Sequence, residues 1–159
     1  MQFLPITHKG ETIFTLVDDA DFERFRQFKW WLSAARYVHG RYTGTWKDNY
    51  VYLHKLILKA PAGLVIDHKN GIKLDNRRSN LRICTQAQNC INSSVRSNSQ
   101  SGYKGVARCG KNTWSAQIAY DGKPVWLGTY PNIEGAARAY DKAALELYGD
   151  FARTNFEYD

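Results

Sequence analysis

Apolar and polar residues alternate in short runs through the first sixty residues of the chain. The clearest runs are residues 12–17 and 50–53, with glycines at positions 10 and 40 as turn signals. This alternation is typical of strands that bury one face. Residues 18–25 place acidic side chains before apolar ones at helical spacing, which predicts a short helix among the strands. We therefore expect a small β-rich layer, with Trp30, Trp31 and Trp46 in its core.

A different pattern follows after the break at Pro61. Residues 64–66 read as a strand, residues 67–80 are polar, basic and rich in asparagine, and residues 81–84 read as a returning strand. Thr85 and Gln88 then fit a capping box, in which a hydroxyl and an amide satisfy backbone N–H groups at a helix start. The sequence thus predicts strand, long loop, strand and a helix from about Gln86.

The last third of the chain has its own pattern. Residues 92–101 contain five serines and two asparagines, the composition of a flexible connector. Strands are predicted near residues 103–107, 114–120 and 125–130, and a helix over residues 133–148, capped by Asn132 and ended by Gly149. The apolar positions of that helix are Ile133, Ala136, Ala137, Tyr140, Ala143, Ala144 and Leu147, and Glu134, Asp141 and Glu146 lie among its polar positions. Its alanines allow close packing on the sheet, so we expect the helix to pack behind the sheet and to leave the other face of the sheet exposed.

The predicted fold class is therefore α+β. We expect a first domain over residues 1–94, a linker over residues 95–101, and a second domain of three strands and one helix over residues 102–159.

Composition and charge narrow the function classes. The hydrophobic fraction of 43% is enough for packed cores, and the formal charge of +7 with a pI near 9.4 favours an anionic partner such as nucleic acid. Residues 1–94 hold fourteen Lys and Arg against eight Asp and Glu, whereas residues 95–159 hold eight against seven. No apolar run has the roughly 18 residues of a membrane helix and no signal peptide is evident, so we expect an intracellular, cytoplasmic protein without a membrane partner. The three cysteines form no CxxC pair, which argues against a thiolate zinc site or a disulfide framework.

Candidate catalytic residues lie at the joints of the strand-loop-strand-helix segment: Asp67, His68, Asn80 and Asn89. The text from Ile66 to Thr85, followed by Gln88 and Asn89, resembles the HNH, or ββα-metal, nucleases, in particular their phage and intron-associated homing type. The resemblance implies a ββα-metal core over about residues 64–94, His68 as general base, Asp67 and Asn89 as cation ligands, and Asn80 as a brace for the loop.

Hard oxygen ligands such as these suit Mg²⁺, with Mn²⁺ as a substitute. Any one of the four residues alone is more often a loop-stabilising group, but their order and spacing favour the site. Arg77, Arg78 and Arg82 are candidate phosphate contacts, with solvated surface the alternative for each. Asp75 and Asn76 are expected to shape the loop or to pair with those arginines. For His54, two interpretations are equally favoured. It contacts DNA or supports the site from behind, or it forms a hydrogen bond in the core.

The C-terminal motifs Ser101-Gly-Tyr-Lys-Gly-Val106, Trp114-Ser-Ala-Gln-Ile118 and Val125-Trp-Leu-Gly-Thr-Tyr130 resemble an AP2 domain. The resemblance implies a three-stranded sheet in the DNA major groove with the helix packed behind it. Lys104, Gln117 and Trp126 match DNA-contacting positions of the family. Arg108 and Lys111 supply charge close in sequence to two positions at which the family has arginines, but out of register with those positions. Trp114 is expected in the core.

The function predicted from the sequence is a metal-dependent endonuclease that hydrolyses phosphodiester bonds of double-stranded DNA, in a phage or bacterial host cell. One alternative is a DNA-binding regulator with an inactive HNH fold. An RNA-binding or ribosome-associated protein explains the charge but not the spacing. One site per chain favours a monomer that nicks one strand. A double-strand break, made by a dimer or by sequential cuts, is the alternative.

Overall fold

A computed structural model describes residues 1–41, 50–95 and 97–158 of the chain. Two compact units are present, Met1–Asn89 and Cys90–Asp159, and both mix helices with strands, as the α+β prediction requires. The predicted core residue Trp46 lies outside the described residues. No described helix has the length and apolar character needed to cross a membrane.

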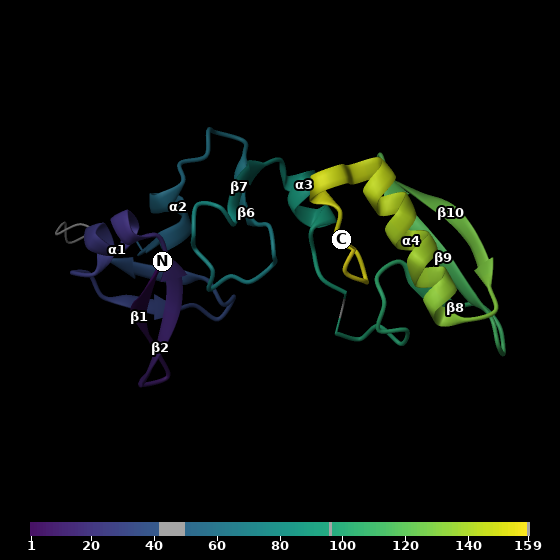
Figure 1. Cartoon of the computed structure of the whole chain (residues 1–159), viewed down its shortest axis with the longest axis horizontal. Coiled ribbons are helices and arrows are strands. Elements are labelled where there is room, and N and C mark those ends of the chain that lie inside the picture. Colours follow the sequence, from purple (N-terminus) through teal and green to yellow (C-terminus); the bar gives the residue numbers. More distant parts are fainter. Residues whose placement is uncertain (42–49, 96, 159) are drawn as a thin grey trace. The chain divides into compact units, whose positions relative to one another are not determined.

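The first unit is built on a sheet with strand order β2-β1-β3-β4-β5 in the described residues (Figure 1). These strands are β1 (Gln2–His8), β2 (Glu11–Val17), β3 (Trp30–Leu32), β4 (Val38–Arg41) and β5 (Tyr50–Tyr52). A tight turn at Lys9 and Gly10, both at positive φ, joins β1 to β2 in an antiparallel hairpin. Leu4, Ile6, Val17 and Trp30 are at most 2% exposed and form the core, as the alternating pattern predicts.

Two short helices flank this sheet. α1 (Asp19–Phe25) matches the predicted helix, although Asp18 makes no side-chain cap and instead accepts a hydrogen bond from the Arg78 backbone N–H at 2.8 Å. α2 (Leu53–Ile57) was not predicted, because its five residues are too few to show a helical period. It buries Leu53, His54 and Ile57 against the core.

The predicted strand-loop-strand-helix segment follows. β6 (Val65–His68) pairs antiparallel with β7 (Leu81–Cys84), and Asp67 lies opposite Arg82. In α3 (Gln86–Ile91) the capping box is confirmed, since the Gln88 N–H donates to the Thr85 hydroxyl at 3.2 Å and the Thr85 N–H donates to the Gln88 side chain at 2.9 Å. This part of the fold follows the sequence closely.

The long loop between β6 and β7 is attached to β2. The Leu16 N–H donates to the Leu74 carbonyl, and the Asn76 N–H donates to the Leu16 carbonyl, both at 2.8 Å. The Thr15 hydroxyl also donates to the Leu74 carbonyl, at 2.7 Å. The N-terminal sheet therefore fixes the shape of the loop that follows the candidate catalytic residues.

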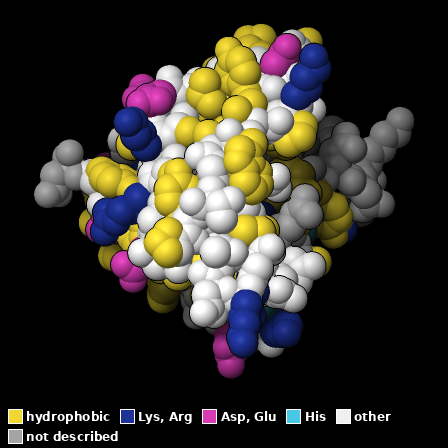
Figure 2. All heavy atoms as spheres, turned by 90° about the vertical axis from the view of Figure 1, so that its right-hand side faces the viewer, with side chains coloured by type: hydrophobic (Ala, Val, Ile, Leu, Met, Phe, Trp, Pro, Cys, Tyr) yellow, Lys and Arg dark blue, Asp and Glu magenta, His cyan; other side chains and the backbone are white. Residues whose placement is uncertain are grey.

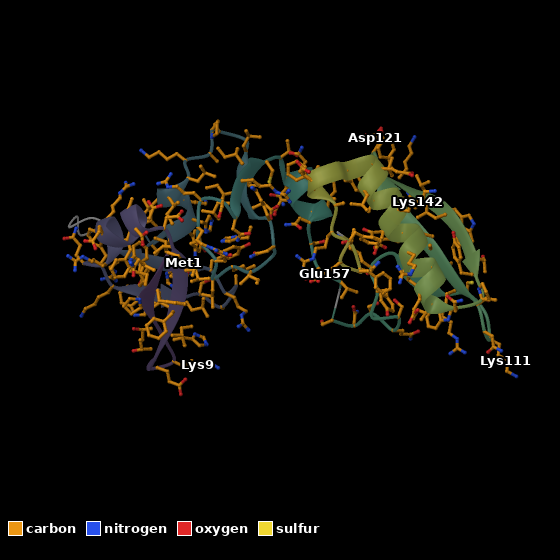
Figure 3. The ribbon with its side chains drawn as sticks, viewed as in Figure 1. Met1, Lys9, Lys111, Asp121, Lys142 and Glu157 are labelled. Atoms are coloured by element: carbon orange, nitrogen blue, oxygen red, sulfur yellow. The ribbon has the colours of Figure 1, made fainter. Side chains whose placement is uncertain are left out.

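The second unit contains a sheet with order β10-β9-β8, formed by β8 (Val106–Arg108), β9 (Trp114–Tyr120) and β10 (Lys123–Tyr130). Lys111 and Asp121, labelled in Figure 3, lie in the turns at opposite ends of this sheet. α4 (Ile133–Tyr148) packs along it, and a short 3-10 helix (η1, Gly149–Phe151) follows. As predicted, Asn132 caps α4 by accepting from the Gly135 N–H at 2.7 Å, and Gly149 ends it.

Small side chains set the spacing between α4 and its sheet. Ala136, Ala137 and Ala144 are completely buried, as expected. Gly105 has a φ of +73°, and a Cβ there would lie 1.9 Å from the Tyr140 ring, so this position accepts no side chain. Leu147 differs from the predicted apolar face, because it is 39% exposed.

Asp141 is the clearest departure from the helical pattern. The sequence places it among the polar positions of α4, yet it is completely buried. Its carboxylate accepts hydrogen bonds from the Asn155 N–H and side chain, from the Phe156 N–H and from the Tyr158 hydroxyl, at 2.7 to 3.1 Å. Asp141 therefore anchors the C-terminal segment to the helix.

We predict that Asp141→Asn destabilises the second unit by roughly 2–3 kcal/mol, because an amide replaces one acceptor oxygen with a donor that faces other donors. Urea unfolding of the full chain, followed by tryptophan fluorescence, measures the change. Glu146→Gln, on the exposed side of the same helix, is the control and should leave stability unchanged. Equal stability of the two variants would contradict the anchoring role.

Candidate nuclease site and DNA-facing sheet

Asp67 and His68 occupy the last two positions of β6, and their side chains have different partners, as expected for neighbours in a strand. The Asp67 Oδ2 atom accepts from Arg82 Nε at 2.9 Å and from Arg82 Nη2 at 2.7 Å. Both side chains are largely buried, with 7% and 11% exposure. Asp67 and Arg82 thus form a cross-strand ion pair where the sequence suggested a metal ligand and a phosphate contact.

His68 is 4% exposed and lies among polar and aromatic neighbours. Its Nε2 atom is 3.3 Å from the Asn76 Oδ1 atom, and its ring centroid is 5.5 Å from that of His54 and 6.1 Å from that of Tyr37. Burial lowers the pKa of His68, while the hydrogen bond with Asn76 and the charge of Asp67 act in the opposite direction. The ring is therefore neutral near physiological pH, the state that a general base requires.

A pocket of about 600 Å³ lies beside these residues in the first unit. Asn89, His54, Lys55 and Lys59 are among its lining residues, together with Tyr37, Tyr52, Ala35, Ala60, Leu64, Val65 and Ile66. Burial, with smaller contributions from the charges of His68 and Lys55, lowers the pKa of His54 to about 3, so this ring is neutral too. The pocket brings the predicted ligand Asn89 to the same place as His54, which touches His68.

Asn80 braces the loop from the inside. Its Oδ1 atom accepts from the Asn70 N–H at 3.0 Å, and its Nδ2 atom donates to the Asp75 carbonyl at 2.8 Å. At 7% exposure it faces the loop rather than solvent. Through these two bonds, Asn80 at the end of the loop holds the start of the loop at Asn70 and its middle at Asp75.

Arg77 and Arg78, like Arg82, each pair with a buried carboxylate. Arg77 binds Asp75 at 2.6 Å, and Arg78 binds Asp21 of α1 at 2.8 Å. The Arg77 guanidinium lowers the pKa of the Asp75 carboxyl. Arg77 and Arg78 remain 34% and 51% exposed, so each can also meet a phosphate, whereas contact at Arg82 requires its pair with Asp67 to open.

No group of three or more His, Cys, Asp or Glu that could hold a metal occurs among the described residues. The two predicted ligands, Asp67 and Asn89, would supply one carboxylate and one amide oxygen. Such a sparse, hard donor set fits a cation that keeps several water ligands, as Mg²⁺ does, better than a tetrahedral Zn²⁺ site.

In the second unit, Gln117 of β9 and Trp126 of β10 are direct cross-strand neighbours on the sheet face away from α4. Trp126 is 61% exposed. Figure 2 shows a face on which hydrophobic and uncharged groups predominate, with Lys and Arg side chains toward its margins. The two predicted contact residues are therefore presented together on the exposed face of the sheet.

Of the other two predicted contacts of this unit, Lys104 lines a pocket of about 420 Å³ together with Gln117, and Arg108 lies at the end of β8. The Lys104 ammonium donates to the Ile91 and Ser93 carbonyls, and burial lowers its pKa to about 8. The Arg108 guanidinium donates to the Gly110 carbonyl at 3.1 Å, and the Lys111 carbonyl is its second acceptor. Both cations are thus engaged by backbone oxygens, Lys104 beside the connector and Arg108 at the end of β8. Trp114 packs partly buried against the core, as predicted.

Sequence reasoning missed several residues of the site. Asn76 was expected to shape the loop or to pair with an arginine, yet it contacts His68. Lys55 and Lys59 were not singled out, although they line the pocket with Asn89. The basic residues near His54 in the sequence were the available signal for these two lysines. Their spacing did not indicate which part of the fold the lysine side chains would face.

Comparison with known proteins agrees with this geometry. The HNH endonuclease family matches residues 59–90, and the AP2 domain family matches residues 101–150. An uncharacterized HNH endonuclease of Acanthamoeba polyphaga mimivirus is 29% identical over 96% of this chain and 80% of its own length.

The AP2 region has relatives in plants. An AP2/ERF and B3 domain-containing protein of Oryza sativa subsp. japonica is 54% identical over 34% of this chain, and an ethylene-responsive transcription factor of Arabidopsis thaliana is 34% identical over 58% of it. The matches span 15% and 60% of the lengths of these plant proteins, so what is shared with them is the domain. The chain therefore carries an HNH endonuclease domain followed by an AP2 domain, a DNA-binding module.

Proposed function

We propose that the chain is a divalent-metal-dependent endonuclease of the homing type, which cuts double-stranded DNA at sites bound through its AP2 domain. The observation that carries the proposal is the neutral, buried His68 at the end of β6, next to a pocket lined by Asn89 and two lysines. A proton acceptor, oxygen donors and cations are the groups that phosphodiester hydrolysis needs.

His68 takes a proton from the attacking water, and Asn80 holds the loop that surrounds it. Asp67 and Asn89 would hold Mg²⁺, or Mn²⁺ as a substitute. A cation held there would supply charge stabilisation for the phosphate and the departing oxygen. Arg82 neutralises Asp67 at 2.7 Å, so cation binding and this ion pair compete for the same carboxylate.

Phosphate groups of the bound strand are held by the basic residues around the pocket. Lys55 and Lys59 line it directly. Arg77 and Arg78, each paired with a buried carboxylate, keep exposed parts that can contact further phosphates. Arg82 joins them only when its ion pair opens. Such contacts position the backbone without reading sequence.

The AP2 sheet supplies recognition. Trp126 and Gln117 lie side by side on the exposed face and contact bases or sugars, and Lys104 and Arg108 contact phosphates after leaving their backbone partners. We expect a monomer that nicks one strand, since one HNH site is present per chain.

A DNA-binding regulator with an inactive nuclease fold is the second candidate. The Asp67–Arg82 pair favours it, because the guanidinium occupies the carboxylate that would hold the cation. Cleavage assays separate the two candidates.

The first test uses a supercoiled plasmid library with random inserts. We expect Mg²⁺-dependent nicking, abolished by chelator and reduced about 10²- to 10⁴-fold in His68→Ala, because the variant lacks the proton acceptor. Gel conversion to the open circle measures the rate, and sequencing of nick sites shows the target. His8→Ala is the matched control. Absence of nicking by the wild type would support the regulator, and equal nicking by His68→Ala would remove the base assignment.

A second test addresses the cation. We expect Asp67→Asn to raise the Mg²⁺ concentration for half-maximal nicking by about tenfold or more, because the variant loses the charged oxygen ligand. Titration of nicking rate against Mg²⁺ gives the value, and Asp19→Asn, at an exposed carboxylate, is the control. An unchanged midpoint would show that Asp67 does not bind the cation.

For the AP2 domain, we predict that Trp126→Ala weakens binding to the mapped target about fivefold or more, since an exposed aromatic contact worth about 1 kcal/mol or more is lost. Mobility shift with chelator present measures affinity without cleavage. Tyr120→Ala, at another exposed aromatic residue of the sheet, is the control and should bind as the wild type does. Equal affinity of all three proteins would exclude Trp126 from the interface.

A further inference from the structure

Asn76 connects the candidate general base to the N-terminal sheet. Its side chain is 1% exposed and has three polar contacts. The Oδ1 atom lies 3.3 Å from His68 Nε2, while Nδ2 lies 2.8 Å from Thr15 Oγ1 and 3.3 Å from the Lys73 carbonyl. The three contacts together leave one consistent assignment of donors and acceptors.

The orientation of the amide follows from its partners. The Lys73 carbonyl can only accept, so the NH₂ group of Asn76 must face it. Thr15 uses its hydroxyl proton to donate to the Leu74 carbonyl at 2.7 Å, so its oxygen accepts from the same NH₂ group. The Asn76 oxygen therefore faces His68.

An amide oxygen has no proton to give, so His68 must donate from Nε2. In a neutral imidazole the other nitrogen then carries the lone pair. We propose that Asn76, held by Thr15 and Lys73, is a positioning residue that keeps neutral His68 protonated on Nε2, which makes Nδ1 the atom that accepts the proton of the attacking water. The catalytic part of this inference rests on the proposed function of His68.

Water gives one proton to Nδ1 as its oxygen forms a bond to phosphorus, and the bond from phosphorus to the departing oxygen breaks. The departing oxygen keeps the electron pair of that bond and takes a proton from solvent water, while the imidazole becomes an imidazolium with N–H groups on both nitrogens. The Nε2–H bond to Asn76 persists through the transfer, so the oxygen of Asn76 also faces the positive charge that develops on the ring. A partner that sets the tautomer and meets the charge supports the base in both protonation states.

The chain of bonds reaches far along the sequence. Thr15 and Asn76 are 61 residues apart, and Thr15 belongs to β2 of the N-terminal sheet. The backbone bonds of Leu16 to residues 74 and 76 hold the same two segments together. The sheet therefore determines the protonation pattern of the site as well as the shape of its loop.

The tautomer can be observed without DNA or metal. Full-length protein with ¹⁵N-labelled histidine is studied at pH 8, above the ordinary pKa of histidine near 6.5, in the presence of chelator. Long-range ¹H–¹⁵N correlations separate a protonated ring nitrogen from an unprotonated one, and the spectrum of His68→Ala identifies the His68 signals among the four histidines. We expect Nε2 protonated and Nδ1 unprotonated in the wild type. An Nδ1-protonated ring or an equal mixture would overturn the proposal.

Two variants in the loop then separate positioning from general stability. Asn76→Ala should give a mixture of both tautomers, whereas Asn70→Ala loosens the same loop through Asp75 and should keep the wild-type pattern. If Asn76→Ala does not fold, Thr15→Val removes one anchor of the amide and should admit the second tautomer, while Thr15→Ser should not. Equal shifts in Asn70→Ala, or none in Asn76→Ala and Thr15→Val, would refute the assignment.

Cleavage kinetics complete the test. We expect Asn76→Ala to lower kcat for nicking about 10- to 100-fold with KM for DNA nearly unchanged. A tautomer mixture with full activity would overturn the catalytic part of the proposal. If His68→Ala cuts as fast as the wild type, the base assignment fails while the NMR result still decides whether Asn76 sets the tautomer.

Discussion

Burial of polar side chains in the loop between β6 and β7 is the constraint that organises the nuclease unit. Asp75, Asn76 and Asn80 are each at most 7% exposed, and a buried polar group without a partner costs about 1–3 kcal/mol. Part of the partner set lies in the loop, such as Arg77 for Asp75. The rest comes from the N-terminal layer, through Thr15 of β2. That layer is therefore a structural part of the site.

The same constraint explains the basic residues of the loop. An excess of Lys and Arg in residues 1–94 suggests an extended surface for phosphates, yet Arg77, Arg78 and Arg82 each meet a buried carboxylate. Buried charges that lose a partner are strongly destabilising, so these pairs restrict how far each arginine can move toward DNA. Lys55 and Lys59, which line the pocket, add further positive charge beside the candidate site.

Local sequence signals predicted the fold well wherever the partners are near in the chain. The capping box at Thr85, the limits of α4 and strands β7 and β9 depend on spacing within a few residues. Long-range partners escaped prediction. Arg78 and Asp21 are 57 residues apart, and no local pattern joins them. Asp141 has polar spacing on α4 but is buried, because the C-terminal segment supplies its donors from residues 155–158. Of the candidate site, the sequence indicated the residue types and their order, whereas the partners of Asp67 and His68 required the fold.

Cutting and recognition place opposite electrostatic demands on the two domains. A catalytic pocket that binds a phosphate and a cation needs charges of both signs, held in place by buried pairs. A sheet that reads a groove needs exposed side chains whose contacts vary with the base, and strong uniform charge there would favour binding to any sequence. Trp126 and Gln117 are uncharged neighbours on the exposed face of this sheet, and Lys104, which lines a pocket with Gln117, is held by backbone carbonyls. Because the Lys104 pKa is lowered only to about 8, most of these ammonium groups stay charged near neutral pH. A phosphate that replaced the two carbonyls would therefore form an ion pair with Lys104. This ion pair would offset the free energy lost when the ammonium leaves the carbonyls of the connector.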